Sequence, residues 1–355
     1  MKFFNIKSLA FSLFLIPATV FANLATLSLT GKCDGCDLSN SQYDLANFSG
    51  KKFYCSNFNN ASFQNADFSN GIIAGKLTRT NMRGADLSSI TLEAAANWQN
   101  CLPPSLGISF DDLSLSLEMT HGTLGEPMFE IDGILFLDSD LRGSTLNGSK
   151  FITPEFHTNF KKSGVIGILA TKLTGVRAKG SSTDGGLMFI SSDAKKIDFS
   201  GLRFAGDSLH PKLSYFFVIS SDWAGANVSR SQLPLYLESS KFTNSNLSES
   251  KISYVFDSDL SNSSLRNSDL RKSTLKNSSF NNNDFSDANL SGANMSGSSF
   301  KGASFVGANL AGANLSNADF SDADFTNANL EDVNLQGTNL CEATGPDGNL
   351  LFIGC

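Results

Sequence analysis

Cysteine is the residue type in this sequence whose number and spacing most directly suggest chemistry. Cys33 and Cys36 have the C-x-x-C spacing of half a structural zinc site. Such a site needs four ligands, however, and the sequence contains no second C-x-x-C and no H-x-x-x-H pair. We therefore expect no metal and no other cofactor. The alternative chemistry is disulfide formation among the six cysteines, which are Cys33, Cys36, Cys55, Cys101, Cys341 and Cys355.

The first residues of the sequence decide between these two chemistries. They read MKFFNIKSLAFSLFLIPATVFA, in which two lysines precede an apolar run from Leu9 to Val20. This pattern predicts a secretory signal peptide that is cleaved after Ala22. The run is interrupted by Pro17 and is shorter than the roughly 20 residues that span a bilayer, so we expect no integral membrane segment after cleavage. A periplasmic or secreted protein would favour disulfides.

The sequence does not choose among the many possible cysteine pairings. Cys341 and Cys355 flank EATGPDGNLLFIG, a turn-rich segment, and they are the pair that we expect first. Cys33 and Cys36 could close on each other, or either could pair with one of the two remaining cysteines.

All three histidines, His121, His157 and His210, fall in loop-like segments of the middle of the chain. Functional residues concentrate in loops on a rigid scaffold, so any specific ligand is expected there. The closest carboxylate pairs, Asp111 with Asp112 and Glu130 with Asp132, have no geometry that sequence alone can assign to acid–base catalysis. G-x-S-x-G, G-x-G-x-x-G and Walker-type motifs are absent. The sequence therefore predicts no enzyme.

Charge argues against a nucleic-acid partner. The formal net charge is −7, and the chain lacks the basic footprint that nucleic-acid binding needs. The acidic residues are also unevenly placed, because no Lys or Arg follows Lys301. Seven acidic residues follow it, namely Asp319, Asp322, Asp324, Glu331, Asp332, Glu342 and Asp347. We interpret this final stretch as a solvated polar surface.

The elements that must position these residues are defined by an apolar residue at every fifth position. This period matches neither a strand nor a helix. From Leu260 to Leu340 no such position is missed, and a small residue stands two positions before most of them. From Phe280 to Leu335 the apolar residues alternate as two Phe and two aliphatic side chains, a pattern that repeats after 20 residues. Four five-residue units per coil would stack Phe on Phe along two sides and aliphatic on aliphatic along the others.

Tandem A(D/N)LXX units resemble the pentapeptide-repeat family, most specifically from Val255 to Leu340. The resemblance implies a right-handed quadrilateral β-helix, an all-β solenoid. The opening CDGCDLSNS, from Cys33, also resembles the CPGCDLSGA-like start of exported members, with Asp34 in place of Pro. The ending TNLCEATGPDG resembles their closing segment.

The five-residue spacing also predicts the organisation of the chain. Residues 1–22 form the signal peptide, and 23–92 form an N-terminal cap with repeat coils. Residues 93–235 form a degenerate or interrupted solenoid with irregular central coils and loops. Residues 236–340 form the regular solenoid, and 341–355 a C-terminal cap loop. The alternative for the middle is a separate globular piece between two solenoids.

These observations predict an exported, non-enzymatic β-solenoid that serves as a scaffold or an interaction surface for an unknown protein partner. Two alternatives stay open. One is an envelope β-helix that binds or cleaves polysaccharide, with its site in the middle loops. The other is an acidic DNA mimic that binds a topoisomerase, as the resemblance to some cytoplasmic family members would imply.

Overall fold

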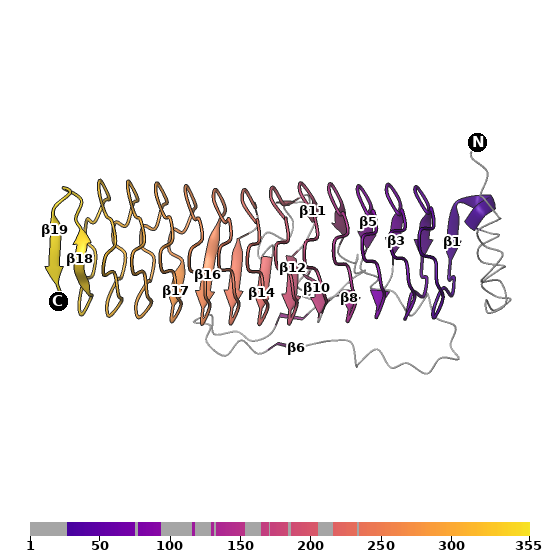
Figure 1. Cartoon of the computed structure of the whole chain (residues 1–355), viewed down its shortest axis with the longest axis horizontal. Coiled ribbons are helices and arrows are strands. Elements are labelled where there is room, and N and C mark those ends of the chain that lie inside the picture. Colours follow the sequence, from indigo (N-terminus) through magenta and orange to yellow (C-terminus); the bar gives the residue numbers. More distant parts are fainter. Residues whose placement is uncertain are drawn as a thin grey trace, which may run out of the picture.

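The computed structural model describes residues 27–74, 77–93, 116–117, 129–130, 133–152, 165–169, 171–183, 186–204, 216–232 and 234–355. The predicted signal peptide, Cys101 and the three histidines lie outside these residues. The described chain forms a long stack of coils, shown in Figure 1 with its axis horizontal.

Each five-residue unit is a short straight piece followed by a tight turn. In the unit around Phe285, the N–H of Ala288 donates to the carbonyl of Phe285 at 3.0 Å, which closes the turn. Asp287, the second of the two residues between them, has a φ of 60°. Only Gly, Asn and Asp adopt this left-handed conformation readily, as at the third position of a type II turn. Gly302 stands in the equivalent place of the unit around Phe300, and glycine adopts this conformation at no steric cost.

 The φ of Gly302 itself is 65°, and the unit around Phe300 closes in the same way, with the N–H of Ala303 donating to the carbonyl of Phe300 at 3.0 Å.

Four such units make one coil in the regular part of the solenoid. Successive units pair in parallel with units 20 residues further on, as in Ser279 with Ser299, Asp284 with Ser304, and Asn289 with Asn309. Four columns of paired residues therefore run along the stack, one on each side. The predicted four-sided β-solenoid is confirmed.

On two of the four sides, the straight pieces are long enough to form parallel sheets in which the strands follow chain order. The first sheet contains β1 (Lys32–Asp34), β2 (Lys52–Tyr54), β3 (Ile72–Ala74), β5 (Thr91–Glu93), β9 (Lys150–Ile152), β11 (Ser182–Thr183) and β13 (Arg203–Phe204). The second contains β4 (Leu77–Thr78), β8 (Gly133–Leu137), β10 (Val165–Leu169), β12 (Gly186–Ile190), β14 (Phe216–Ile219), β15 (Leu235–Glu238), β16 (Ile252–Phe256) and β17 (Thr274–Lys276). Most described strands of the middle region thus belong to the same two sheets as the flanking coils.

Two short antiparallel pairs stand outside these sheets. One joins β6 (Ser116–Leu117) to β7 (Phe129–Glu130). The other joins β18 (Leu340–Thr344) to β19 (Leu350–Ile353) and forms the far end of the stack in Figure 1.

The core is a set of side-chain columns that run along the axis. Phe300 stacks between Phe280 and Phe320, with ring centroids 4.8 and 4.7 Å away and nearly parallel planes. Phe305 stacks in the same way on Phe285, at 4.8 Å, and on Phe325, at 5.1 Å. The predicted alternation of two Phe and two aliphatic residues therefore places Phe on Phe along two sides, as close packing of every layer requires.

Buried serines form a polar column inside one corner of the solenoid. The N–H of Ser221 donates to Oγ of Ser240, the N–H of Ser240 to Oγ of Ser258, and that of Ser258 to Oγ of Ser278, at 3.1–3.2 Å. These links span 19, 18 and 20 residues, so they keep the coils in register where coil length varies. A buried polar group is tolerated when it is hydrogen-bonded in this way.

Both ends of the described solenoid carry cap structures. At the start, residues 27–30 form one helical turn with Leu27 buried against the first coil. At the far end, the β18–β19 hairpin lies where a further coil would stack, and Leu351 packs against the core. None of the helices in the described residues is long and apolar enough to cross a membrane.

Candidate functional site

Most outward-facing Asp and Asn side chains are used by the turns themselves. Asp319 Oδ1 accepts the N–H of Ser321 at 3.0 Å, and Asn309 Oδ1 accepts the N–H of Ala311 at 3.1 Å. The residue before each core position thus bonds to the backbone two residues on, as Asx turns do. These carboxylates and amides are structural groups, and their number along the surface is no sign of catalysis.

The described residues contain no cluster of three or more His, Cys, Asp or Glu side chains that could hold a metal ion. The serine hydroxyls of the interior column are buried, and they accept hydrogen bonds from backbone N–H groups of the adjacent coil. A nucleophile with a neighbouring base is the minimum that covalent catalysis needs. Ser62 Oγ does donate to Asp44 Oδ1 at 2.7 Å, but the same oxygen accepts the N–H of Gln64 at 2.8 Å, so this carboxylate serves to join two coils.

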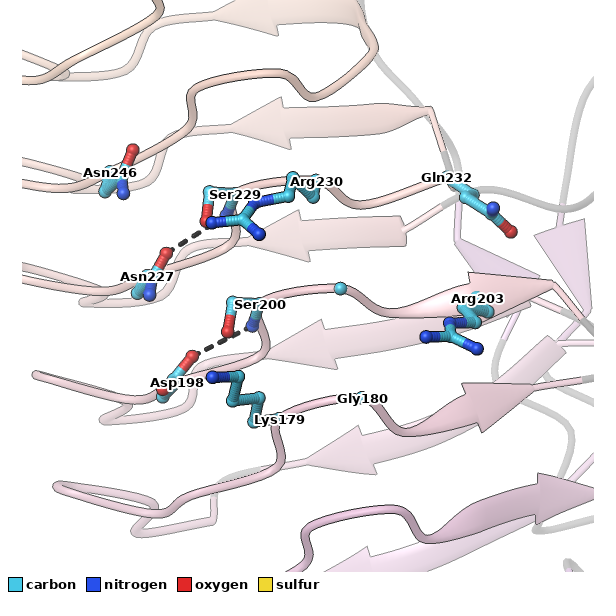
Figure 2. A pocket seen from close by; sticks show the side chains of 11 residues that line it. Lys179, Gly180, Asp198, Ser200, Arg203, Asn227, Ser229, Arg230, Gln232 and Asn246 are labelled. Carbon is cyan, nitrogen blue, oxygen red and sulfur yellow. Dashed lines mark hydrogen bonds between the residues drawn. The ribbon is translucent and has the colours of Figure 1, made fainter.

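A groove of about 390 Å³ crosses the coils of the middle region. Figure 2 shows its lining residues, which come from four successive coils. Lys179, Arg203 and Arg230 supply positive charge, while Gln232, Asn227 and Asn246 supply amides. We call this depression the cationic groove.

The polar groups of the cationic groove divide into those held by the backbone and those left for a ligand. Asp198 Oδ1 accepts the N–H of Ser200 at 2.9 Å, and Asn227 Oδ1 accepts the N–H of Ser229 at 3.2 Å (Figure 2). These acceptors are therefore engaged in turns. The side chains left to contact a ligand include Lys179, Arg203 and Gln232.

The cations of the groove differ in how far they are neutralised. Arg230 Nε lies 3.8 Å from Glu249 Oε1, and both side chains are largely exposed, so this ion pair is weak. Within the described ranges, Lys179 and Arg203 form no ion pair. Two of the three positive charges are thus available to a ligand.

An aromatic column on the outer face of the second sheet was not predicted. Phe217, Tyr236 and Tyr254 occupy one register position on β14, β15 and β16. The rings of Tyr236 and Tyr254 stack with centroids 4.2 Å apart. Burial raises the pKa of the Tyr236 phenol, with the neighbouring Tyr254 and Glu238 adding to the effect.

The sequence does carry a signal for this column. The strands GLMFI, FFVI and LYLE are apolar at consecutive positions, whereas a regular unit is apolar only every fifth residue. A continuous apolar run indicates a strand covered on both faces. In agreement, Met188 and Phe217 face outward and are nevertheless fully buried.

The structure places the described cysteines in disulfides. Cys33 bonds to Cys36, with Cα atoms 5.7 Å apart, and Cys341 bonds to Cys355, with Cα atoms 4.9 Å apart. Cys55 is disulfide-bonded as well. The histidines that we expected near a ligand lie outside the described residues, and the cationic groove is built without them.

Comparison with known proteins gives one family match. The model of pentapeptide repeats matches in eight copies, over residues 32–70, 258–297 and 303–340. The search of curated protein sequences returned no significant match.

The solved structures that match this chain include three proteins. Rfr23, a pentapeptide-repeat protein from the cyanobacterium Cyanothece, is 36% identical over 24% of this chain, with a TM-score of 0.24. The match covers 58% of the Rfr23 chain, which is less than two thirds of its length. HetL, a pentapeptide-repeat protein from the cyanobacterium Nostoc, is 14% identical over 94% of this chain and all of its own, with a TM-score of 0.22. QnrB1, a plasmid-mediated fluoroquinolone resistance protein, is 18% identical over 56% of this chain and 88% of its own, with a TM-score of 0.19.

Proposed function

We propose that this chain, a four-sided solenoid that contains eight matches to pentapeptide repeats, is an exported, non-enzymatic scaffold whose outer surface binds another protein. The observation that carries the proposal is the use of its polar side chains. Asp, Asn and Ser serve the turns and the interior column, and the described residues contain no cluster of His, Cys, Asp or Glu that could hold a metal ion. Rigid stacked coils present an extended surface, which suits binding.

Export is supported by the predicted signal peptide and by the disulfides. Cys33–Cys36 and Cys341–Cys355 would persist in an oxidising compartment and would be reduced in most cytosols.

The experiment is intact mass measurement of the native protein after cell fractionation, with and without reductant and thiol alkylation. We expect a mass that begins at Asn23, recovered outside the cytoplasm, with no thiol alkylated before reduction. Reducing conditions followed by alkylation should then label all six cysteines. A full-length cytoplasmic protein with six free thiols would contradict export.

A second candidate function is the binding of an acidic saccharide, and the cationic groove is the observation that favours it. Lys179 and Arg203 would pair with carboxylates, and the amide of Gln232 would bond to hydroxyls. The same cations count against an acidic DNA mimic, because they interrupt any continuous negative surface along the middle coils.

The saccharide-binding hypothesis predicts that oligogalacturonate binds the mature chain and that a neutral maltooligosaccharide does not. The double variant Lys179→Gln with Arg203→Gln should bind oligogalacturonate about tenfold more weakly in calorimetric titration, a loss of about 1.4 kcal/mol. Lys272→Gln with Lys276→Gln removes the same charge from a coil that does not line the groove and is the matched control. Equal loss in both double variants would reduce the effect to net charge and contradict a site.

A further inference from the structure

The far end of the solenoid exposes apolar side chains that the rest of the molecule buries. Leu335 is 38% exposed, Leu350 57%, Phe352 68% and Ile353 51%. Only two other large apolar residues in the described chain are exposed, Leu29 and Leu45, and both lie near its start. We call these four residues the end patch.

Three residues of the end patch lie on β19, which is an edge strand. β19 pairs only with β18 in the described structure, and Figure 1 shows it outermost at this end. Inside the stack, each coil bonds to the next, as the N–H of Leu310 does to the carbonyl of Asn329 at 2.9 Å. The outer edge of β19 has no such neighbour, and unpaired edge groups are a template for another strand.

The edge of β19 lacks the features that usually protect an exposed strand. Proteins blunt such edges with Lys, Pro or bulges. The sequence of β19 is LLFI, and the irregularity of the hairpin lies in β18, between Cys341 and Ala343. Leu351 points into the core, while Leu350 and Phe352 point the other way because side chains alternate along a strand.

Charge around the end patch selects the kind of partner. Glu331, Asp332, Glu342 and Asp347 are exposed in the same coil and hairpin, and no Lys or Arg follows Lys301. A second copy of this chain, docked end to end, would bring these carboxylates together. A segment that carries Lys or Arg would complement them.

We propose that β19 binds an extended, cationic and apolar segment of a partner protein by strand addition. The backbone of the segment pairs with the outer edge of β19, its apolar residues cover Leu350 and Phe352, and its Lys or Arg residues face the surrounding carboxylates. This proposal rests on the proposed function as a protein-binding scaffold, and it names the place and the chemistry of one partner.

The test uses the full mature chain and two labelled eight-residue peptides, one alternating Val with Lys and the other alternating Val with Glu. Fluorescence anisotropy should show binding of the Val/Lys peptide, weakened by salt, and about tenfold weaker binding of the Val/Glu peptide. Phe352→Ser should weaken Val/Lys binding about tenfold. Leu45→Ser removes an exposed apolar residue near the other end of the described chain and should leave binding unchanged.

Three results would overturn the proposal. Equal Val/Lys affinity in Phe352→Ser and in the parent chain would exclude the end patch. Equal binding of both peptides would exclude charge selection. Sedimentation that shows a dimer lost in Phe352→Ser would assign the patch to a second copy. The fractionation experiment is independent of all three, so export can hold while the end patch fails, and circular dichroism confirms that each variant is folded.

Discussion

Phe300→Ala is expected to lower the free energy of unfolding by about 3–5 kcal/mol, the usual range for a buried Phe. Phe300 is fully buried, and its ring lies between those of Phe280 and Phe320 at van der Waals stacking distance. Truncation removes both stacking contacts and leaves a cavity in one layer. The backbone cannot collapse into it, because the N–H of Phe300 is fixed to the carbonyl of Asp319 at 2.7 Å.

The loss should appear in urea unfolding and, locally, in hydrogen exchange of the amides in the coils that contain Phe280, Phe300 and Phe320. Local measurement is needed because repeat proteins need not unfold in one step. Phe352→Ala is the matched control, since that ring is 68% exposed, and we expect a change of about 0.5 kcal/mol or less. Similar losses in both variants would contradict the layered core.

Cys341→Ser is expected to lower the free energy of unfolding of the C-terminal coils by about 3 kcal/mol. The Cys341–Cys355 disulfide closes a loop across a sequence separation of 14, and so restricts the unfolded chain. It also holds β19 against the last coil, which has a stacked neighbour on one side only. A terminal coil without its cap loses this restraint and should fray first.

Thermal unfolding under oxidising conditions measures this effect. Cys355→Ser should lower the midpoint to the same extent, and reductant should lower the midpoint of the parent chain but change neither variant further at this end. An unchanged midpoint in Cys341→Ser would show that the disulfide does not stabilise the cap.

The regular half of the fold could be predicted from sequence because every local signal agrees there. A core residue at every fifth position, a small residue two before it and turn formers around it specify one unit. The order of Phe280, Phe285, Leu290 and Met295 then specifies four units per coil, since only that number stacks like on like. The observed ring stacks confirm this argument.

The cationic groove could not be predicted in the same way. It depends on which residues become neighbours in adjacent coils, and in the middle region the offset is irregular. Ser192 bonds to Ser221 across 29 residues, and Thr80 to Ser139 across 59. Arg203 and Arg230 meet in one groove only after these offsets are known. The local sequence of the middle region does not reveal these offsets. In the regular region, the constant spacing of 20 residues reveals the offset directly.

The direction of the hydrogen bonds between coils has a mechanical consequence. Bonds such as that from the N–H of Leu290 to the carbonyl of Asn309 run along the long axis of the stack, from one coil to the next (Figure 1). When the two ends are pulled apart, every coil-to-coil interface carries the same force in series. The weakest interface then separates first, and the solenoid unfolds one coil at a time. A tether of this kind would limit the tension between whatever it joins and would lengthen before it breaks.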